Sequence, residues 1–183
     1  STKEGRGYNL LHLNALYDLE NQLYLDAVIQ NGREEHESRA LVELVDRSRL
    51  KEPVIMIADR GYEAYNNIAH IEQKNWNYLI RAKEKRGILS GLKLPDTPEF
   101  DVVFSYFLSK RLTNRIRREP QKYRWIPSKV RFDYIKNASD ALYPISFRVV
   151  RFAVKDGLYE TVITNLPADR FPPPLLCALY HKR

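Results

Sequence analysis

The sequence predicts a mixed α/β fold, and three observations lead to that prediction. A wholly apolar run at Val54–Ala58 is typical of a strand buried on both faces inside a helix-covered sheet. Segments 10–17 and 23–29 alternate in polarity, which indicates two further strands. Segments 34–50 and 63–76 carry apolar residues at helical spacing, which indicates helices that alternate with strands.

The two alternating segments are predicted to form a β-hairpin around the polar turn at residues 18–22. Asn31 and Gly32 then break the second strand. The alternation puts these side chains on one face: Leu11, Leu13, Ala15 and Tyr17 from the first strand, and Leu23, Leu25, Ala27 and Ile29 from the second.

The helices and the apolar strand are predicted to complete an open mixed sheet. The helix at 34–50 has an acidic first turn, which suits the helix dipole. The helix at 63–76 is followed by a short strand at 77–82, which delivers Arg81 and Lys83 to its C-terminal end. The expected core contacts of the two helices are Ala40, Leu41, Leu44, Val45, Tyr65, Ile68, Ile71 and Trp76.

The residue composition changes after about residue 87. This change predicts three parts: a core at 1–86, a β-rich basic insertion at 87–167, and the start of a C-terminal core helix at 168–183. Within the insertion, segments 145–154 and 159–164 are predicted strands joined around Asp156-Gly157. The last helix is expected to begin near Leu175 and to continue through Arg183.

The net charge of +7 is concentrated in one segment of the chain. Residues 1–80 sum to −4, residues 81–155 to +11, and residues 156–183 to zero. This asymmetry suggests a polyanionic partner, nucleic acid first, although a solvated basic face remains an alternative. The densest basic run consists of Lys110, Arg111, Arg115, Arg117 and Arg118. Aromatic residues follow it, and Trp125, Phe132 and Tyr134 could either stack on bases or belong to the core.

Several functional classes lack support in the sequence. The four histidines are scattered and Cys177 stands alone, so no zinc pattern or internal disulfide is expected, and Cys177 is predicted to be a small buried hydrophobe. His12 is expected to be structural. No Walker, dinucleotide or nucleophile-elbow motif occurs. No membrane span or signal peptide is visible. The single cysteine fits a reducing, intracellular location.

The remaining candidate for chemistry is the carboxylate of Asp59. Open α/β sheets bind ligands at the carboxyl ends of their strands, and Asp59 directly follows the apolar strand. Taken alone, the pattern favours a simpler interpretation, in which Asp59 caps the following turn or helix.

A family resemblance supports the catalytic interpretation. Gly7–Leu19 resembles the second strand of DDE transposases of the bacterial insertion-sequence, cut-and-paste type. Ile57–Tyr62 is similar to the family's second catalytic block, and Tyr78–Lys83 to its next strand. Thr164–Pro167 resembles the end of its β-rich insertion, and Tyr180–Arg183 the opening of its Tyr-x2-Arg-x3-Glu-x6-Lys signature. These blocks cover nearly the whole chain in the family's order.

The resemblance implies an RNase H-like fold and metal-dependent phosphoryl transfer on transposon-end and target DNA, with Mg²⁺ or Mn²⁺ held by three carboxylates. Asp59 would be the second of these acids, and Gly61 would let the backbone turn away beside the metals. The implied DNA contacts are Arg60, Tyr62, Arg81, Lys83, Arg111, Arg115, Arg117, Arg118, Tyr180 and Arg183. The resemblance also implies a homodimer assembled on double-stranded DNA in the bacterial cytoplasm, associated with the nucleoid.

Two departures from the family pattern matter. The first acid would lie before Ser1 and the third four residues after Arg183. We therefore expect a catalytic-domain fragment that is inactive alone and binds little or no metal. We also expect its sheet, which lacks the first strand, to leave a gap or to rearrange. A non-catalytic DNA-binding relic and a metal-dependent nuclease without strand transfer remain alternatives.

Overall fold

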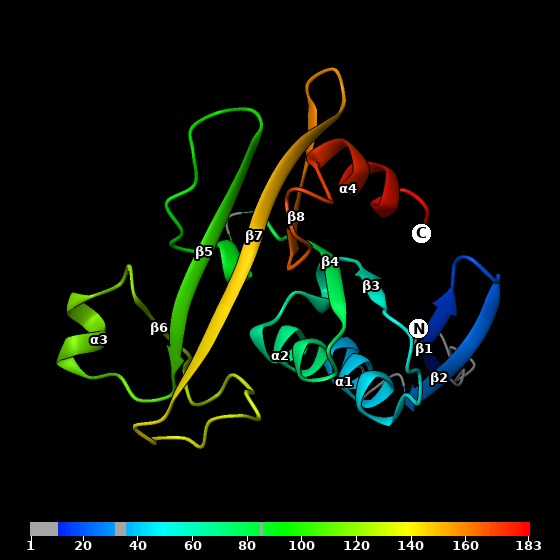
Figure 1. The fold of residues 1–183 in the computed structure, drawn as a ribbon. Coiled ribbons are helices and arrows are strands. Elements are labelled where there is room, and N and C mark those ends of the chain that lie inside the picture. Colours follow the sequence, from blue (N-terminus) through cyan, green and yellow to red (C-terminus); the bar gives the residue numbers. More distant parts are fainter. Residues whose placement is uncertain (1–10, 32–35, 85) are drawn as a thin grey trace, which may run out of the picture.

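A computed structural model describes residues 11–31, 36–84 and 86–183, and it has a mixed α/β fold (Figure 1). The elements are β1 (Leu11–Asp18), β2 (Leu23–Asn31), α1 (Glu37–Arg47), β3 (Ile55–Ala58), the 3₁₀ helix η1 (Arg60–Tyr62), α2 (Tyr65–Gln73), β4 (Asn77–Arg81), the 3₁₀ helix η2 (Gly87–Leu89), β5 (Phe100–Ser109), α3 (Asn114–Arg118), β6 (Tyr123–Trp125), β7 (Leu142–Lys155), β8 (Leu158–Thr164) and α4 (Pro173–Tyr180). The predicted fold class is confirmed.

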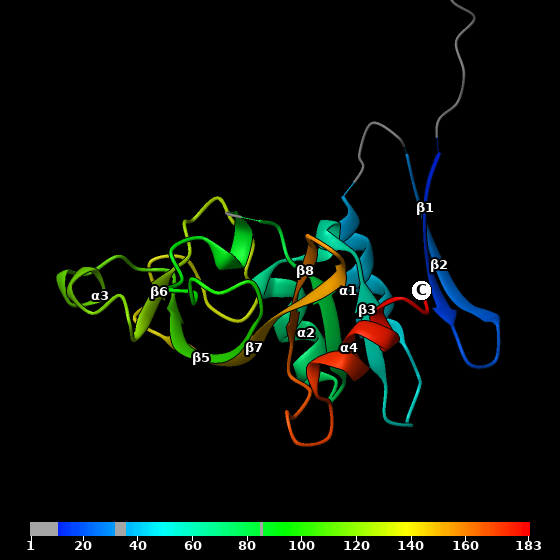
Figure 2. The same ribbon diagram turned by 90° about the horizontal axis from the view of Figure 1, so that it is seen from above.

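The main sheet has six strands in the order β3-β4-β8-β7-β5-β6. The pairs β3–β4 and β5–β6 are parallel, and the pairs between them are antiparallel. β8 pairs with β4, so the strands that follow residue 87 extend the same sheet that contains the apolar strand β3. The long β5–β7 ladder then carries the sheet away from the helices towards α3 (Figures 1 and 2).

Helices cover both faces of the β3–β4 end of this sheet. One face presents Met56 and Ile80 to a core that includes Val45 of α1 and Ile68 of α2. The opposite face presents Leu79 to a second core, which includes Leu176 and Tyr180 of α4, with Ile55 and Ile57 partly buried against it. Because a core lies against each face of β3, all of its residues are apolar. Its second face is half-buried, however, rather than fully buried as predicted.

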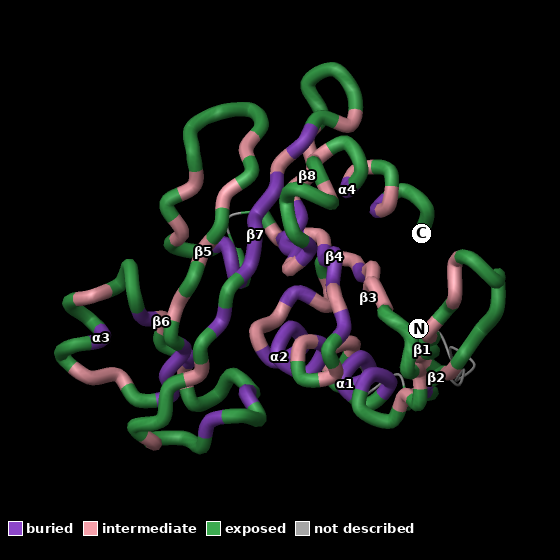
Figure 3. The backbone as a smooth tube through the Cα atoms, in the orientation of Figure 1, coloured by how far each residue is buried: buried purple, intermediate pink, exposed green. Residues whose placement is uncertain are grey.

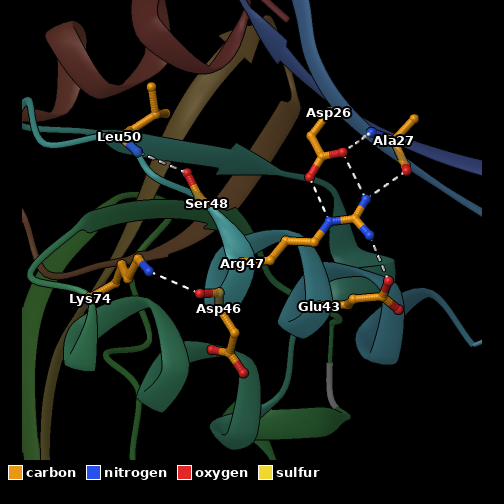
Figure 4. Close-up of polar contacts among 8 residues, drawn as sticks. All are labelled: Asp26, Ala27, Glu43, Asp46, Arg47, Ser48, Leu50 and Lys74. Carbon is orange, nitrogen blue, oxygen red and sulfur yellow. Dashed lines mark hydrogen bonds and ion pairs between the residues drawn. The ribbon is translucent and has the colours of Figure 1, made fainter.

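The hairpin of β1 and β2 forms a sheet of its own. Its inner face packs on α1, with Val28 beside Ala40 and Leu44. Arg47 at the end of α1 anchors it further, because its guanidinium donates to both carboxylate oxygens of Asp26, at 2.6 and 2.7 Å, and to the carbonyl oxygen of Ala27 (Figure 4). Within the residues described, neither hairpin strand pairs with β3.

Much of the hairpin is exposed (Figure 3), and its exposed residues include large apolar side chains. Leu13 and Ile29, which are cross-strand partners, are 62% and 66% exposed, and the inner-face Asn14 is 3% exposed. The apolar side chains that alternate along the two strands therefore lie on the exposed face of the hairpin. The buried Asn14 side chain is satisfied, since its Oδ1 accepts a hydrogen bond of 2.8 Å from the hydroxyl of Tyr62.

Some element boundaries differ from the predicted ones. α2 begins at Tyr65 rather than residue 63, because η1 and an extended Glu63 separate it from β3. α4 begins at Pro173, since a first-turn proline loses no intrahelical hydrogen bond, and it ends at Tyr180 rather than continuing through Arg183. The predicted start of the first helix at residues 34–35 lies outside the described residues. Cys177 is half-buried rather than buried.

Candidate active site at the end of strand β3

Asp59 lies where β3 ends, and its side chain caps the turn that follows. It is the N-cap residue of η1, and its Oδ1 accepts a hydrogen bond of 2.7 Å from the backbone N–H of Arg60. The capping interpretation is thus correct in this structure. Capping engages one carboxylate oxygen, and the side chain remains 46% exposed, so it does not exclude a second role.

Asp59 opens onto a cavity of about 690 Å³. The walls come from the turn after β3, the end of β4 and the segment after it, and the first half of β8, with one residue from α1. The lining residues are Glu37, Asp59, Arg60, Gly61, Tyr62, Arg81, Ala82, Lys83, Glu84, Arg86, Tyr159, Glu160 and Thr161. A cavity at the carboxyl ends of β3 and β4 matches the position at which open α/β sheets bind ligands.

Cations dominate the immediate surroundings of Asp59. Partial burial acts to raise the pKa of Asp59, but the Arg60 N–H and the guanidinium groups of Arg183, Arg81 and Arg60 outweigh burial, and the net pKa is lowered. Arg183 Nη1 lies 3.6 Å from Asp59 Oδ2. Arg81 also pairs with Glu160 at 3.3 Å. Asp59 is therefore an ionised carboxylate among guanidinium groups.

The described residues do not by themselves fit a divalent metal ion. Among them, no group of three or more His, Cys, Asp or Glu side chains could hold one. Glu160 lines the same cavity, but it is paired with Arg81, and positive neighbours disfavour a metal cation. Asp59 can supply one hard oxygen ligand, and further carboxylates are needed to complete a magnesium site.

The other residues of the Asp-Arg-Gly-Tyr block have distinct positions. Arg60 is exposed at the cavity. Tyr62 is half-buried, with its hydroxyl directed to Asn14, and burial raises the pKa of Tyr62. Gly61 has no left-handed backbone conformation in this structure; a side chain there would meet the carboxylate of Glu37. The glycine therefore leaves room for Glu37 rather than making a special turn.

Tyr180 and Arg183 differ in accessibility. Tyr180 is 2% exposed, and its hydroxyl is buried without a hydrogen-bond partner in the described part of the chain. The guanidinium of Arg183 lies over the Tyr180 ring, 4.3 Å from its centroid, while pairing with Asp59. Of the two predicted phosphate contacts, Arg183 is the one that reaches the site in this arrangement.

The basic residues around α3 lie at the other edge of the sheet, far from Asp59 (Figures 1 and 2). Arg117 and Arg118 are exposed. Arg111 pairs with Asp140 at 2.7 Å, and Arg115 pairs with Glu119 at 3.5 Å and lies over the Tyr123 ring. The predicted contacts thus form two groups: Arg60, Tyr62, Arg81, Lys83, Tyr180 and Arg183 near Asp59, and Arg111, Arg115, Arg117 and Arg118 around α3.

The aromatic residues of the basic segment divide between the surface and the core. Phe132 is 5% exposed and packs edge-on against Tyr143, so it is a core residue. Trp125 and Tyr134 are 45% and 36% exposed. Trp125 ends the edge strand β6, where an exposed ring is accessible to a partner.

Sequence reasoning missed four residues that shape the site: Glu37, Glu63, Arg86 and Glu160. Glu160 lies in a strand that periodicity assigned to the insertion, and only the pairing of β8 with β4 brings it to Asp59. Glu63 carried a signal, since it is an acid directly after the Asp-Arg-Gly-Tyr block. The pattern indicated only a helix start there.

A comparison with known protein families agrees with the fold. A mixed six-stranded sheet with flanking helices and an acid at a strand end is consistent with an RNase H-like enzyme fold. A family model described as the transposase DDE domain matches residues 1–183, so the chain belongs to the transposase DDE domain family. DNA substrates and divalent metal ions are general features of this family. A search of curated proteins finds no match, and no helix among the described residues could span a membrane.

Proposed function

We propose that this chain supplies one metal-binding carboxylate, Asp59, and a DNA-contacting surface to a transposase that cuts and joins transposon-end DNA. The observation that carries the proposal is the placement of Asp59, ionised and half-exposed, at a cavity whose rim also carries Arg60, Lys83 and Arg86. Basic side chains beside a strand-end acid can hold a phosphate diester against it. In this family a divalent ion stabilises the charge that develops in phosphoryl transfer.

The chain alone is proposed to be inactive, because the described residues provide too few carboxylates for a metal site. The other acids would come from flanking sequence of the same protein, and Mg²⁺ or Mn²⁺ would bind only when they are present. We further propose that the protein acts as a homodimer on paired DNA ends, with the exposed arginines of α3 as a second DNA-contacting region.

Replacing Asp59 by Asn in the protein that includes its flanking sequence tests the catalytic role. D59N keeps an oxygen that can cap η1, but it removes the charge. We expect Mg²⁺-dependent cleavage of transposon-end DNA to fall by at least about 100-fold, the upper range for a residue that only supports a metal ligand. D96N, at an exposed acid in the turn before β5, is the matched control and should retain activity. Full cleavage by D59N would contradict the proposal.

A second candidate is a DNA-binding protein without chemistry, and the guanidinium groups around Asp59 favour it. In that case no cleavage appears with either metal, and D59N binds DNA more tightly because an anion is lost from a cationic surface. A nuclease without strand transfer would hydrolyse DNA but not join it. An assay that measures hydrolysis and joining separately distinguishes these outcomes.

A further inference from the structure

Glu63 joins the two walls of the cavity at Asp59. It is 5% exposed and follows η1, the turn that carries Arg60 and Gly61. Its carboxylate accepts backbone hydrogen bonds from the segment after β4, at 2.5 Å from the N–H of Lys83 and 2.6 Å from that of Ile88. One buried side chain therefore fixes the backbone from which Lys83 and Arg86 reach the cavity.

The arrangement around Glu63 is specific to a carboxylate. Burial raises the pKa of Glu63, while the N–H groups of Lys83, Ile88 and Leu89 act in the opposite direction by favouring the charged form. Each carboxylate oxygen accepts one of the two hydrogen bonds. Gly87 has φ +61°, and a Cβ there would approach Glu63 Oε1 to 2.5 Å, so this backbone also needs a glycine.

Arg124 binds the same segment through its carbonyl groups. It lies on the short strand β6, and its Nη2 donates to the carbonyl oxygens of Ile88 at 3.0 Å and Ser90 at 2.5 Å. Its guanidinium also lies over the Tyr106 ring, 5.4 Å from the centroid. Arg124 belongs to the basic aromatic stretch of the sequence, yet these donors bind backbone carbonyl groups of the same chain.

We propose that Glu63 and Arg124 are positioning residues, which hold the segment formed by residues 82–84 and 86–90 so that Lys83 and Arg86 meet DNA phosphate at the Asp59 cavity. Glu63 accepts hydrogen bonds from the backbone N–H groups of Lys83 and Ile88, and Arg124 donates to the carbonyl groups of Ile88 and Ser90, so the two residues hold the segment through different backbone groups. The inference rests on the proposed function, because it assumes that this cavity receives DNA.

A mutant cycle on the full chain tests the proposal, with a short duplex of arbitrary sequence as the probe and the salt dependence of its affinity as the readout. The double variant K83Q/R86Q should reduce the slope of log affinity against log salt by about 1.8, from about 0.9 per phosphate contact. E63Q should produce part of that loss, because an amide offers one acceptor oxygen where the carboxylate offers two. The triple variant E63Q/K83Q/R86Q should be no weaker than K83Q/R86Q.

E72Q is the matched control, because Glu72 is a half-buried acid on α2 that contacts the Tyr78 hydroxyl rather than this segment. Hydrogen exchange gives a second readout: the amides of Lys83 and Ile88 should lose protection in E63Q and keep it in E72Q. R124Q removes the opposing contact, and it tests the same coupling if E63Q fails to fold.

The possible outcomes distinguish a failure of the positioning role from a failure of the proposed function. If K83Q/R86Q lowers the salt slope but E63Q and R124Q leave it unchanged, the positioning role is wrong and the DNA surface stands. If K83Q/R86Q itself leaves the slope unchanged, the cavity is not a DNA surface and both proposals are overturned. Additive losses in the triple variant would also contradict positioning, since they would mean that Glu63 acts independently of the two cations.

Discussion

The two groups of basic side chains lie at opposite edges of one sheet and are held very differently. Near Asp59, Lys83 extends from a backbone fixed by Glu63, and Arg81 is paired with Glu160. At the other edge, Arg117 and Arg118 project from α3, a helix of five residues capped by Thr113. The strands β8, β7 and β5 lie between β4, which precedes Lys83, and β6, which follows α3.

This difference shows that similar charge in the sequence can serve different physical roles. A preorganised cation loses less conformational entropy when it meets a phosphate, so under the proposed function the cavity would place one phosphate of the DNA. Exposed arginines on a short helix contribute attraction that salt screens and that does not depend on one geometry. The cavity is therefore expected to determine where DNA is held, and α3 how strongly it is attracted.

The largest expected effect is on stability. It tests whether every basic residue of the predicted insertion, 87–167, is available to bind a partner. Arg148 on β7 is 5% exposed; it pairs with Asp101 at 2.5 Å and donates to the carbonyl oxygen of Leu166 at 2.6 Å. Arg148→Met leaves a partly buried carboxylate unpaired and should reduce the free energy of unfolding by about 3–5 kcal/mol. Urea unfolding measures this. The control Arg151→Met, on the same strand, should cost about 0.5–1 kcal/mol for its contact with the Tyr159 ring.

The next effect concerns DNA affinity without a change in stability. The triple variant R115Q/R117Q/R118Q should reduce the salt slope of DNA binding by up to about 2.7, at about 0.9 per lost phosphate contact. Its unfolding free energy should change by about 0.5 kcal/mol or less per site, since these side chains are exposed. The control R39Q/K51Q/K93Q removes the same charge from exposed positions elsewhere. If both variants reduce the salt slope of DNA binding equally, α3 does not differ from the rest of the exposed surface.

The smallest expected effect tests whether the loop after β6 is held rigidly against the core. Asp133 bridges this loop to α2, where it contacts His70 at 3.0 Å and Asn66 at 3.0 Å, and it also pairs with Arg131. Burial acts to raise the pKa of Asp133, but the hydrogen bonds from Arg131, Asn66 and His70 lower it to about 2. Ionised Asp133 therefore favours the folded state above the unfolded pKa near 3.8.

This contribution should disappear as the pH falls from about 5 to about 2, the folded-state pKa of Asp133. Because the side chain is 32% exposed, we expect a loss of about 1–2 kcal/mol after allowance for solvent screening. Urea unfolding at several pH values measures it. D133N should weaken the dependence of the unfolding free energy on pH between about 5 and about 2, relative to the control D96N. An unchanged pH dependence would show that this bridge does not hold the loop against the core.

Local pattern was sufficient for most elements. The apolar run gave β3, alternation gave both hairpins, and Asp156-Gly157 gave the β7–β8 turn, where Gly157 has φ +73°. The start of α2 was predicted two residues too early, because Glu63 and Ala64 have an extended backbone that the polarity pattern does not reveal. The role of Glu63 was missed because its two hydrogen-bond donors, on Lys83 and Ile88, belong to a segment that no local pattern relates to it.

The sequence by itself determined the two hairpins, β3, β4, the helices α1, α2 and α4, the class of protein, and the position of Asp59 at the end of an apolar strand, because periodicity and short motifs are local properties of the chain. It did not indicate β5, α3 or β6. Only the tertiary structure decided which hairpin face α1 covers, that Arg183 lies against Asp59, and that Arg124 grips a backbone segment of the cavity. These contacts depend on where distant segments cross. Alternation defines the two faces of a strand, but the packing of other elements decides which face is buried.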